Sequence, residues 1–335
     1  MIKSGERVVV VAGAGCSAEF GLPTGIGLMR RLHSEALQES PTSGLSFADI
    51  FRRPFLEVFP SAYENKFNGR DVLEFLREAK NLYADSIDLF AFNHPSKAEV
   101  CKAYSTLGIM RGLYSETSVQ DRFGDTSNYF ELAYKWRKPL VSAGNSSRPN
   151  WLASLARKYT EGKTGPEQLD PDALQIVTFN YDPIIEDALK FFVGKTERFR
   201  DAAETQLPRV HHIYGSFPRM SARLDNYSFF SQNADAIKYI NDLPRPNPDS
   251  AREAINRATQ IYIIGFDMDP MNVELIGLAQ APATKCALAY DGNIRLIARL
   301  KNVGVVDKLL LQGTEAQPLS IGHASQQGFF DLASL

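Results

Sequence analysis

Cysteine is scarce in this sequence, and its placement excludes two classes of protein. Only three of the 335 residues are cysteines, Cys16, Cys101 and Cys286, and no two of them form a CxxC pair. A disulfide framework needs more cysteines, and a cysteine zinc site needs closely spaced pairs. We therefore expect neither, and we expect a protein of the reducing cytoplasm.

A surplus of either charge is also lacking. The chain has 37 basic and 39 acidic residues, which gives a formal net charge of −2. Without a positive field, the protein should attract neither nucleic acid nor an anionic membrane. Short basic pairs such as Arg30-Arg31 and Arg52-Arg53 are typical of solvated helix faces.

Long apolar runs are the third absence. No segment approaches the roughly 18 apolar residues of a membrane span. The N-terminus resembles a secretion signal, because Lys3 and Arg7 precede an apolar run, but the run up to Gly13 is at the short limit for a signal core. We expect a soluble, cytoplasmic protein.

What the sequence does contain is an alternation of strand and helix patterns. Helical spacing at Pro183–Phe192 and Ala251–Ala258 separates apolar runs that are typical of strands. These runs are Val8–Ala12, Ala173–Phe179, Arg209–Gly215, Gln260–Phe266 and, as a plausible last strand, Cys286–Tyr290. The alternation predicts an α/β fold, a Rossmann-like parallel sheet with helices on both faces.

Residues 41–139 interrupt this alternation. They contain helical patterns broken by prolines, as at Asp71–Phe92 and after Pro95, and hardly any strand pattern. We expect one domain over residues 1–335. Its Rossmann-like core is formed by residues 1–40 and 140–312, its helical insertion by residues 41–139 and its C-terminal tail by residues 313–335, which no pattern places.

The predicted strands end in glycine and polar residues. The segments at their ends are GAGCS, TFNYD, HHIYGS and GFDMDPMN, in chain order. Ligands of parallel sheets bind beyond the carboxyl ends of the strands. These four segments are therefore the candidate site.

The glycine turn after the first strand fits a loose dinucleotide fingerprint through Gly13, Gly15 and Ala18. In such a turn the backbone amides from Gly13 to Ser17 can face a diphosphate at a helix N-terminus. The alternative is a turn with no ligand. A dehydrogenase also needs a second strand with an acidic residue about 20 positions on. Glu35 is near that distance but lies in a helical pattern, so hydride transfer is disfavoured.

Asn180 and Asp182 follow the second predicted strand at a spacing of two. Asp182 precedes a proline and a helix, so capping of that helix and ligand binding weigh equally for it. For Asn180, ligand binding is favoured. Of the neighbours His211 and His212, only one can face a given site, because strand side chains alternate. A packed or surface histidine is the alternative.

The last segment, GFDMDPMN, holds Asp267, Asp269 and Asn272. These residues could bind ribose hydroxyls or a divalent ion, or they could form a turn with a helix cap, which Pro270 favours. No histidine has a neighbouring cluster of carboxylates or cysteines, so we predict no metal site.

Together, the four strand ends resemble the sirtuin (SIR2) superfamily, in the same chain order. GAGCSAEFGLP is similar to the family pattern GAGxSxxxGIP, TFNYD to its TQNID block, HHIYGS to its catalytic HG block and IIGF to its later glycine segment. The residues that match the first two blocks are Gly13, Ala14, Gly15, Ser17, Gly21, Pro23, Thr178, Asn180 and Asp182. By resemblance, Gly215, Ser216, Gly265, Phe266 and Asp267 also contact the cofactor.

Departures from the sirtuin pattern indicate which group of the sirtuin superfamily the chain resembles. The interval from Ser216 to Gln260 contains no cysteine, whereas protein-deacylating sirtuins carry a four-cysteine zinc ribbon there. The chain therefore resembles the SIR2-like NAD hydrolase modules of bacterial anti-phage systems, including the Thoeris type. This resemblance implies cleavage of NAD+ to nicotinamide and ADP-ribose, with NAD depletion and abortive infection as the outcome.

The catalytic histidine is another departure. Aligning Gly215-Ser216 with the family's HGS places Tyr214 in the histidine position. His212 lies two residues earlier and would share a strand face with Tyr214. Either His212 does the work of the histidine, or Tyr214 supplies a polar contact, or the site binds NAD or ADP-ribose as a regulatory module without cleaving it.

The resemblance also implies roles and partners. Asn180 would hold the water or a ribose hydroxyl, Asp182 would fix the nicotinamide ribose, and His212 would accept a proton. An unregulated NAD hydrolase would kill its own cell, so we expect a separate sensor or regulatory subunit, a nucleotide signal or homo-oligomerisation to release activity.

Overall fold

In the computed structural model of the chain, the described residues are 2–18, 20, 22–30, 78, 87–98, 101, 102, 104–106, 109, 151–217, 237–239, 248–291, 307–314, 329 and 330. They divide between two compact units. Unit 1 comprises residues 1–19, 139–213 and 247–335, and unit 2 comprises residues 20–138 and 214–246.

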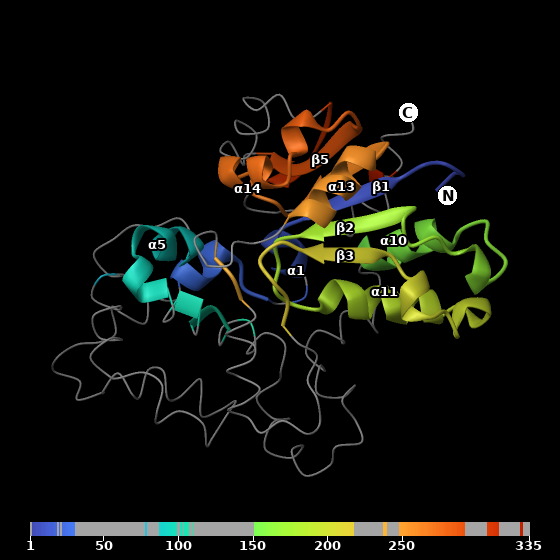
Figure 1. Ribbon diagram of the computed structural model, residues 1–335, viewed down its shortest axis with the longest axis horizontal. Coiled ribbons are helices and arrows are strands. Elements are labelled where there is room, and N and C mark those ends of the chain that lie inside the picture. The colour runs from blue at the N-terminus through green and yellow to red at the C-terminus, as the bar shows by residue number, and fades with distance from the viewer. Residues whose placement is uncertain are drawn as a thin grey trace, which may run out of the picture. The chain divides into compact units, whose positions relative to one another are not determined.

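Unit 1 is built on a six-stranded parallel sheet with the spatial order β3-β2-β1-β4-β5-β6 (Figure 1). The strands are β1 Val8–Ala12, β2 Leu174–Thr178, β3 Arg209–His212, β4 Gln260–Ile264, β5 Thr284–Asp291 and β6 Lys308–Thr314. The predicted α/β fold is confirmed. The predicted bounds of β1, β2 and β4 hold to within two residues at each end.

The described helices connect these strands or lie in unit 2. The α-helices are α1 Ala14–Ala18, α5 Ile87–Asn93, α10 Trp151–Thr160, α11 Ile184–Gly194, α13 Asp249–Arg257 and α14 Pro270–Leu275. Short 3-10 helices are η1 Pro95–Lys97, η2 Pro166–Gln168, η3 Glu197–Phe199, η4 Glu204–Gln206 and η5 Leu278–Gln280.

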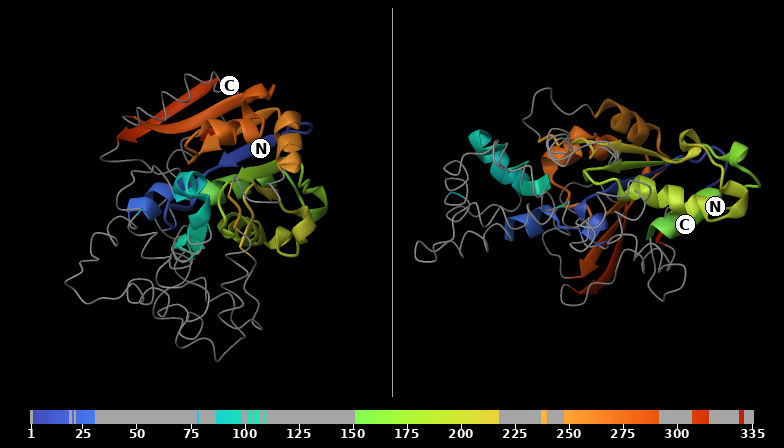
Figure 2. Two further views of the ribbon diagram at one scale, coloured as in Figure 1. Left: turned by 60° about the vertical axis from the view of Figure 1, so that its left-hand side comes forward. Right: turned by 90° about the horizontal axis from the view of Figure 1, so that it is seen from below.

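The strand order reverses between β1 and β4. The chain adds β2 and β3 on one side of β1 and then returns to place β4 on the other side. Crossovers between parallel strands are right-handed. The helices that precede the return therefore cover one face of the sheet, and the helices within and after the return cover the other face. Accordingly, α10 and α11 lie on one face of the sheet and α13 and α14 on the other (Figures 1 and 2). In such sheets the reversal marks the crevice for ligands.

The register brings the carboxyl ends of four strands level. Ala12 pairs with Thr178 on one side and with Ile264 on the other, and Thr178 pairs in turn with His212. The segments that follow these residues therefore leave the sheet side by side.

Burial explains why the central strands are uniformly apolar. Every residue of β1, β2 and β4 is buried, since helices cover both faces of the sheet. Val8–Ala12 is no more than 1% exposed. Burying a side chain of valine size stabilises the fold by about 1.5 kcal/mol or more, so an alternating pattern would be costly here.

The predicted third strand, Arg209–Gly215, is too long. The strand ends at His212, although the amide of Ile213 still donates to the carbonyl of Thr178 at 3.0 Å. The chain then turns, and Gly215 has a left-handed φ of +87° that is incompatible with a pleated strand. Strand periodicity therefore does not extend from His212 to Tyr214.

Cys286–Tyr290 is not the last strand. It lies inside β5, and β6 pairs with β5 in parallel, so residues 313 and 314 of the expected tail belong to the sheet. Further along, Phe329 and Phe330 pack edge-on against Tyr262 of β4. The carbonyl of Phe330 accepts hydrogen bonds from the side chains of Tyr262 and Lys158.

The described residues of unit 2 include several helical segments. Thr24 caps the helix at residues 25–30, because its Oγ1 accepts from the amide of Gly27 at 3.0 Å. The helical turn that begins at Pro95 is also present, as η1. Ser105 Oγ and Tyr239 Oη, both buried, lie 3.1 Å apart.

Candidate functional site

The reversal point of the sheet is held by direct contact between two glycine turns. The amide of Gly13 donates to the carbonyl of Ile264 at 3.1 Å, and that of Gly15 donates to the carbonyl of Gly265 at 3.0 Å. A Cβ on Gly13 would lie 2.3 Å from the carbonyl oxygen of Gly265, and one on Gly15 would lie 2.8 Å from its Cα. Glycine is required here because the two backbones touch.

This contact changes the interpretation of the glycine turn. The amides of Gly13, Gly15 and Cys16 all donate to protein carbonyls, Cys16 to Gly13 at 2.9 Å. In this conformation those three amides are not donors to a diphosphate. Cys16 itself is buried and its thiol contacts the carbonyl of Ile264 at 3.2 Å, which is a packing role.

Three polar side chains from the ends of β1 and β2 form a chain of hydrogen bonds. Asn180 Nδ2 donates to Ser17 Oγ at 2.9 Å, and Ser17 Oγ donates to Asp182 Oδ2 at 2.8 Å. All three residues are buried, with 5%, 4% and 3% of their surface exposed. The structure therefore brings together residues that the sequence places about 165 positions apart.

The amide of Asn180 has a defined orientation. Its Nδ2 also donates to the carbonyl of Gly13 at 3.1 Å, and a carbonyl can only accept, so the nitrogen must face Gly13. The amide oxygen, Oδ1, is buried and has no hydrogen-bond partner among the described residues. Leaving such an acceptor unmet costs about 1–3 kcal/mol, so this atom is positioned for a donor from a ligand or water.

Asp182 caps the next helix and also belongs to this chain. Its Oδ1 accepts from the amide of Ile184 at 3.2 Å, at the start of α11. Burial raises the pKa of Asp182 to about 6, although the hydrogen bonds from Ser17 and Ile184 oppose the rise. The carboxyl group is therefore ionised at pH 7 but easily protonated in mild acid.

We expect Asp182 to make stability fall with rising pH. Its folded pKa of about 6 lies above the ordinary 3.8, so the folded state binds more protons between these values. The free energy of unfolding should lose about 3 kcal/mol between about pH 4 and pH 7 through this group. Asp182→Asn should reduce that loss in urea titrations at several pH values. An identical pH dependence in variant and wild type would contradict the assignment.

His212, the last residue of β3, contacts both the Asn180 loop and α11. Its Nδ1 lies 2.7 Å from the carbonyl oxygen of Asn180, and its Nε2 lies 2.7 Å from Glu186 Oε1. Burial lowers the pKa of His212, but the hydrogen bond and charge of Glu186 and the carbonyl of Asn180 outweigh it and raise the pKa above its ordinary value.

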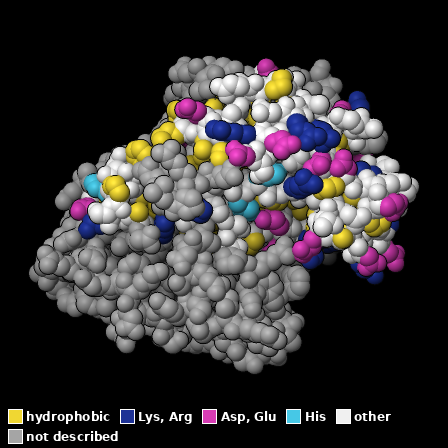
Figure 3. Space-filling model, viewed as in Figure 1, with side chains coloured by type: hydrophobic (Ala, Val, Ile, Leu, Met, Phe, Trp, Pro, Cys, Tyr) yellow, Lys and Arg dark blue, Asp and Glu magenta, His cyan; other side chains and the backbone are white. Residues whose placement is uncertain are grey.

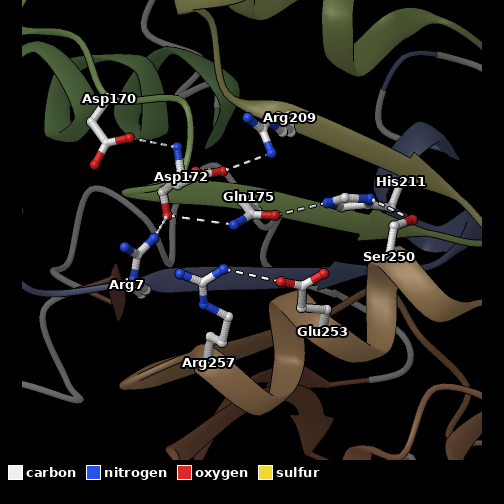
Figure 4. A network of polar contacts seen from close by, with 9 residues as sticks. All are labelled: Arg7, Asp170, Asp172, Gln175, Arg209, His211, Ser250, Glu253 and Arg257. Atoms are coloured by element: carbon white, nitrogen blue, oxygen red, sulfur yellow. Dashed lines mark hydrogen bonds and ion pairs between the residues drawn. The ribbon is translucent and has the colours of Figure 1, made fainter.

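His211 points to the other side of the sheet, as strand alternation predicts. Figure 4 shows its ring between Gln175 of β2 and Ser250 of α13. Its Nε2 lies 2.8 Å from Gln175 Oε1 and its Nδ1 lies 3.1 Å from Ser250 Oγ. His211 therefore links β3 to α13 and is not part of the group around Asn180.

The loop after β4 combines a stacked aromatic pair with left-handed backbone. Phe266 stacks on Phe179, the residue after β2, with ring centroids 4.7 Å apart and an interplanar angle of 7°. Gly265 has a φ of +57° and buried Met268 a φ of +55°, which is unusual for a residue with a side chain. Asp267 is exposed.

In the next part of this loop, the structure shows the helix cap that was one of the alternatives for this segment. Asp269 caps α14, because its Oδ1 accepts from the amides of Met271 at 3.0 Å and Asn272 at 3.4 Å. Its carboxylate thus has a structural role in this conformation.

The other expected site residues are distributed as follows. Thr178 Oγ1 donates to the carbonyl of Ala12 and accepts from the amide of Asn180, so it supports the loop. Tyr214, Gly215, Ser216 and Pro23 lie in unit 2, where Ser216 Oγ donates to the carbonyl of Phe217. Ala14 is the first residue of α1. Gly21 lies outside the described residues.

Glu186 is the site residue that sequence reasoning missed. It lies four positions after Asp182, in the first turn of α11, where an acidic residue is ordinarily explained by the helix dipole. No local pattern indicates that it reaches a histidine of β3.

The arrangement is one of buried acceptors, without a metal cluster. Among the described residues, no group of three or more histidines, cysteines and acidic residues could hold a metal ion.

No described helix has both the length and the apolar character needed to cross a membrane. On the face shown in Figure 3, acidic and basic side chains are interspersed on the described surface.

Comparison of the sequence with protein-family models and with curated proteins finds no match in either set.

Proposed function

We propose that this protein is a SIR2-like NAD+ glycohydrolase that cleaves NAD+ to nicotinamide and ADP-ribose. The observation that carries the proposal is the buried, unpartnered Oδ1 of Asn180 at the reversal point of a Rossmann-like sheet. A second buried acceptor, Glu186 Oε2, also lacks a partner among the described residues. Buried acceptors require donors, and the ribose hydroxyls of NAD+ are donors.

The chemistry requires little acid catalysis. The bond between ribose C1′ and the nicotinamide nitrogen breaks, its electron pair leaves with nicotinamide, and water adds to the resulting oxocarbenium ion with loss of a proton. Asn180 Oδ1 would accept from a ribose hydroxyl or the attacking water. Asp182, whose two oxygens accept hydrogen bonds from Ser17 and from the amide of Ile184, would act through its negative charge on the oxocarbenium ion.

His212 would accept the proton only after its ring has lost one hydrogen and one of its contacts has opened. Both ring nitrogens face acceptor atoms in this conformation, so neither offers a lone pair to water. This observation favours one alternative, a regulatory module that binds NAD or ADP-ribose without turnover. Tyr214, in the position of the family's catalytic histidine, favours the same alternative.

Nicotinamide release from NAD+ tests the proposal. The purified protein, alone and with the products of neighbouring genes, should release nicotinamide, measured by chromatography. Asn180→Ala should lower the rate about 100-fold or more by removing the acceptor. The exposed Glu197→Gln is the matched control and should leave the rate unchanged. His212→Ala and Tyr214→Phe identify which of the two residues turnover requires.

The outcomes separate the two functions. Nucleotide binding by calorimetry without nicotinamide under any condition would select the regulatory module. Neither binding nor release would refute both functions.

The resemblance to defence modules supports a cellular role. We place the protein as an effector of anti-phage defence whose NAD depletion begins when a separate sensor subunit, a nucleotide signal or homo-oligomerisation releases it. Its expected location is the cytoplasm, where NAD+ is available. NAD+ is the substrate, and no metal enters the proposed chemistry.

A further inference from the structure

Glu186 and His212 form a contact between α11 and β3 that ends at the backbone of Asn180. The ring of His212 lies between Glu186 Oε1 and the carbonyl oxygen of Asn180, each 2.7 Å from a ring nitrogen. The side chains of His212 and Glu186 are 9% and 26% exposed. The contact is therefore shielded from solvent, especially at the ring.

Hydrogen-bond chemistry fixes the protons on this ring. A backbone carbonyl and an ionised carboxylate both accept and cannot donate. With Glu186 ionised, the two short contacts to acceptors place a hydrogen on each ring nitrogen, which is the imidazolium form. A neutral imidazole has one N–H, so without the carboxylate either tautomer can form, and one of them presents a lone pair to the carbonyl of Asn180.

We propose that Glu186 is a positioning residue: it holds His212 with hydrogens on both nitrogens, so that Nδ1–H always donates to the carbonyl of Asn180 and fixes the Asn180 side chain. The activity part of this inference rests on the proposed NAD+ cleavage. The protonation of His212 does not.

The charges around the ring agree with this role. Burial alone would lower the pKa of His212 and favour the neutral ring, whereas Glu186 and, more weakly, the charge of Asp182 act in the opposite direction. His211, the adjacent residue, has a pKa lowered by burial and by Arg209, so it carries little positive charge at pH 7 to repel the ring. Glu186 makes the largest favourable contribution.

The contact with His212 matters because the other hydrogen bonds of Asn180 do not involve its backbone carbonyl. Its backbone amide donates to Thr178 Oγ1 at 3.1 Å, and its side-chain nitrogen donates to Gly13 and Ser17. The contact with His212 holds the remaining backbone group, the carbonyl. With these contacts made, Oδ1 is the atom that stays available.

Nitrogen-15 NMR of the histidine rings tests the protonation of His212 directly. In the full-length protein, His212 should titrate above 6.5 in the wild type, with both nitrogens protonated at pH 6. In Glu186→Gln and Glu186→Ala, burial should bring the pKa below 6.5. The control Glu197→Gln should leave it unchanged. An unchanged His212 titration in both Glu186 variants would overturn the proposal.

The two variants should differ in activity, which a purely structural role would not produce. The amide of glutamine can donate to Nε2 and keep Nδ1–H on Asn180, so Glu186→Gln should retain NAD+ cleavage to within about threefold. Glu186→Ala should lose about tenfold above neutral pH, as expected for one orienting hydrogen bond, and recover in mild acid. Equal losses in both variants at every pH would refute positioning through the proton. A wild type that shows the NMR behaviour but never cleaves NAD+ would refute the proposed function alone.

Discussion

Gly265→Ala is expected to destabilise the protein strongly. A Cβ at this position would lie 2.4 Å from the amide nitrogen of Cys16 and 2.8 Å from the carbonyl carbon of Gly15. Both are backbone atoms, so no side-chain rotation can relieve the overlap. The turns after β1 and β4 must separate, and the free energy of unfolding should fall by about 4 kcal/mol or more.

Gly277→Ala is the matched control for this prediction. Gly277 has nearly the same left-handed backbone, with a φ of +67° against +57°, but nothing lies within 4 Å of its added Cβ. Gly277→Ala should therefore cost only the backbone strain, about 1–2 kcal/mol. Urea titrations of both variants measure the difference. Equal losses would show that the close approach of the turns contributes nothing.

Near neutral pH, Asn180→Asp should lower the free energy of unfolding more than Asn180→Ala, although aspartate has nearly the shape of asparagine. The new oxygen would replace the donor that faces the carbonyl of Gly13 and Ser17 Oγ. It would place a second negative charge in a buried position beside Asp182. An unpaired buried charge costs about 3–5 kcal/mol, whereas alanine removes the donor without adding a charge.

The pH dependence separates these two effects. The pKa of the introduced carboxyl should be raised by burial, so the Asn180→Asp protein should lose stability as the pH rises towards neutral. In mild acid, a protonated carboxyl can donate to Gly13 and the two variants should converge. Urea titrations at about pH 4.5 and pH 7.5 measure this. Equal stability of the two variants near neutral pH would contradict the orientation assigned to the Asn180 amide.

The central sheet could be predicted from the sequence because burial on both faces leaves an unmistakable pattern. Val8–Ala12 and Gln260–Ile264 are apolar without alternation, as a covered parallel strand requires. The strand Lys308–Thr314 was not predicted, because a short run of leucines followed by glutamine and glycine fits a helix or a strand equally. Strand pairing, which decides the matter, depends on partners distant in the chain.

The site was predictable to the level of strand ends and no further. Asn180, Asp182 and His212 were expected near the carboxyl ends of neighbouring strands, and they do lie there. The partner of His212 was not predictable, since Glu186 is indistinguishable in sequence from an ordinary first-turn carboxylate. The close contact of Gly13 and Gly15 with Gly265 was not predictable either, because the same glycines fit a phosphate-binding turn.

The order in which the sheet is assembled has a consequence for synthesis of the protein. Ser17 is made before its partners Asn180 and Asp182, which lie more than 160 positions later, and β4 must still be added beside β1. Domains emerge from the ribosome N-terminus first, and contacts this distant form late in folding. A nascent or truncated chain that lacks β4 cannot close the two glycine turns together. Any activity of the site therefore becomes available only after β4 and the turn that follows it have been made.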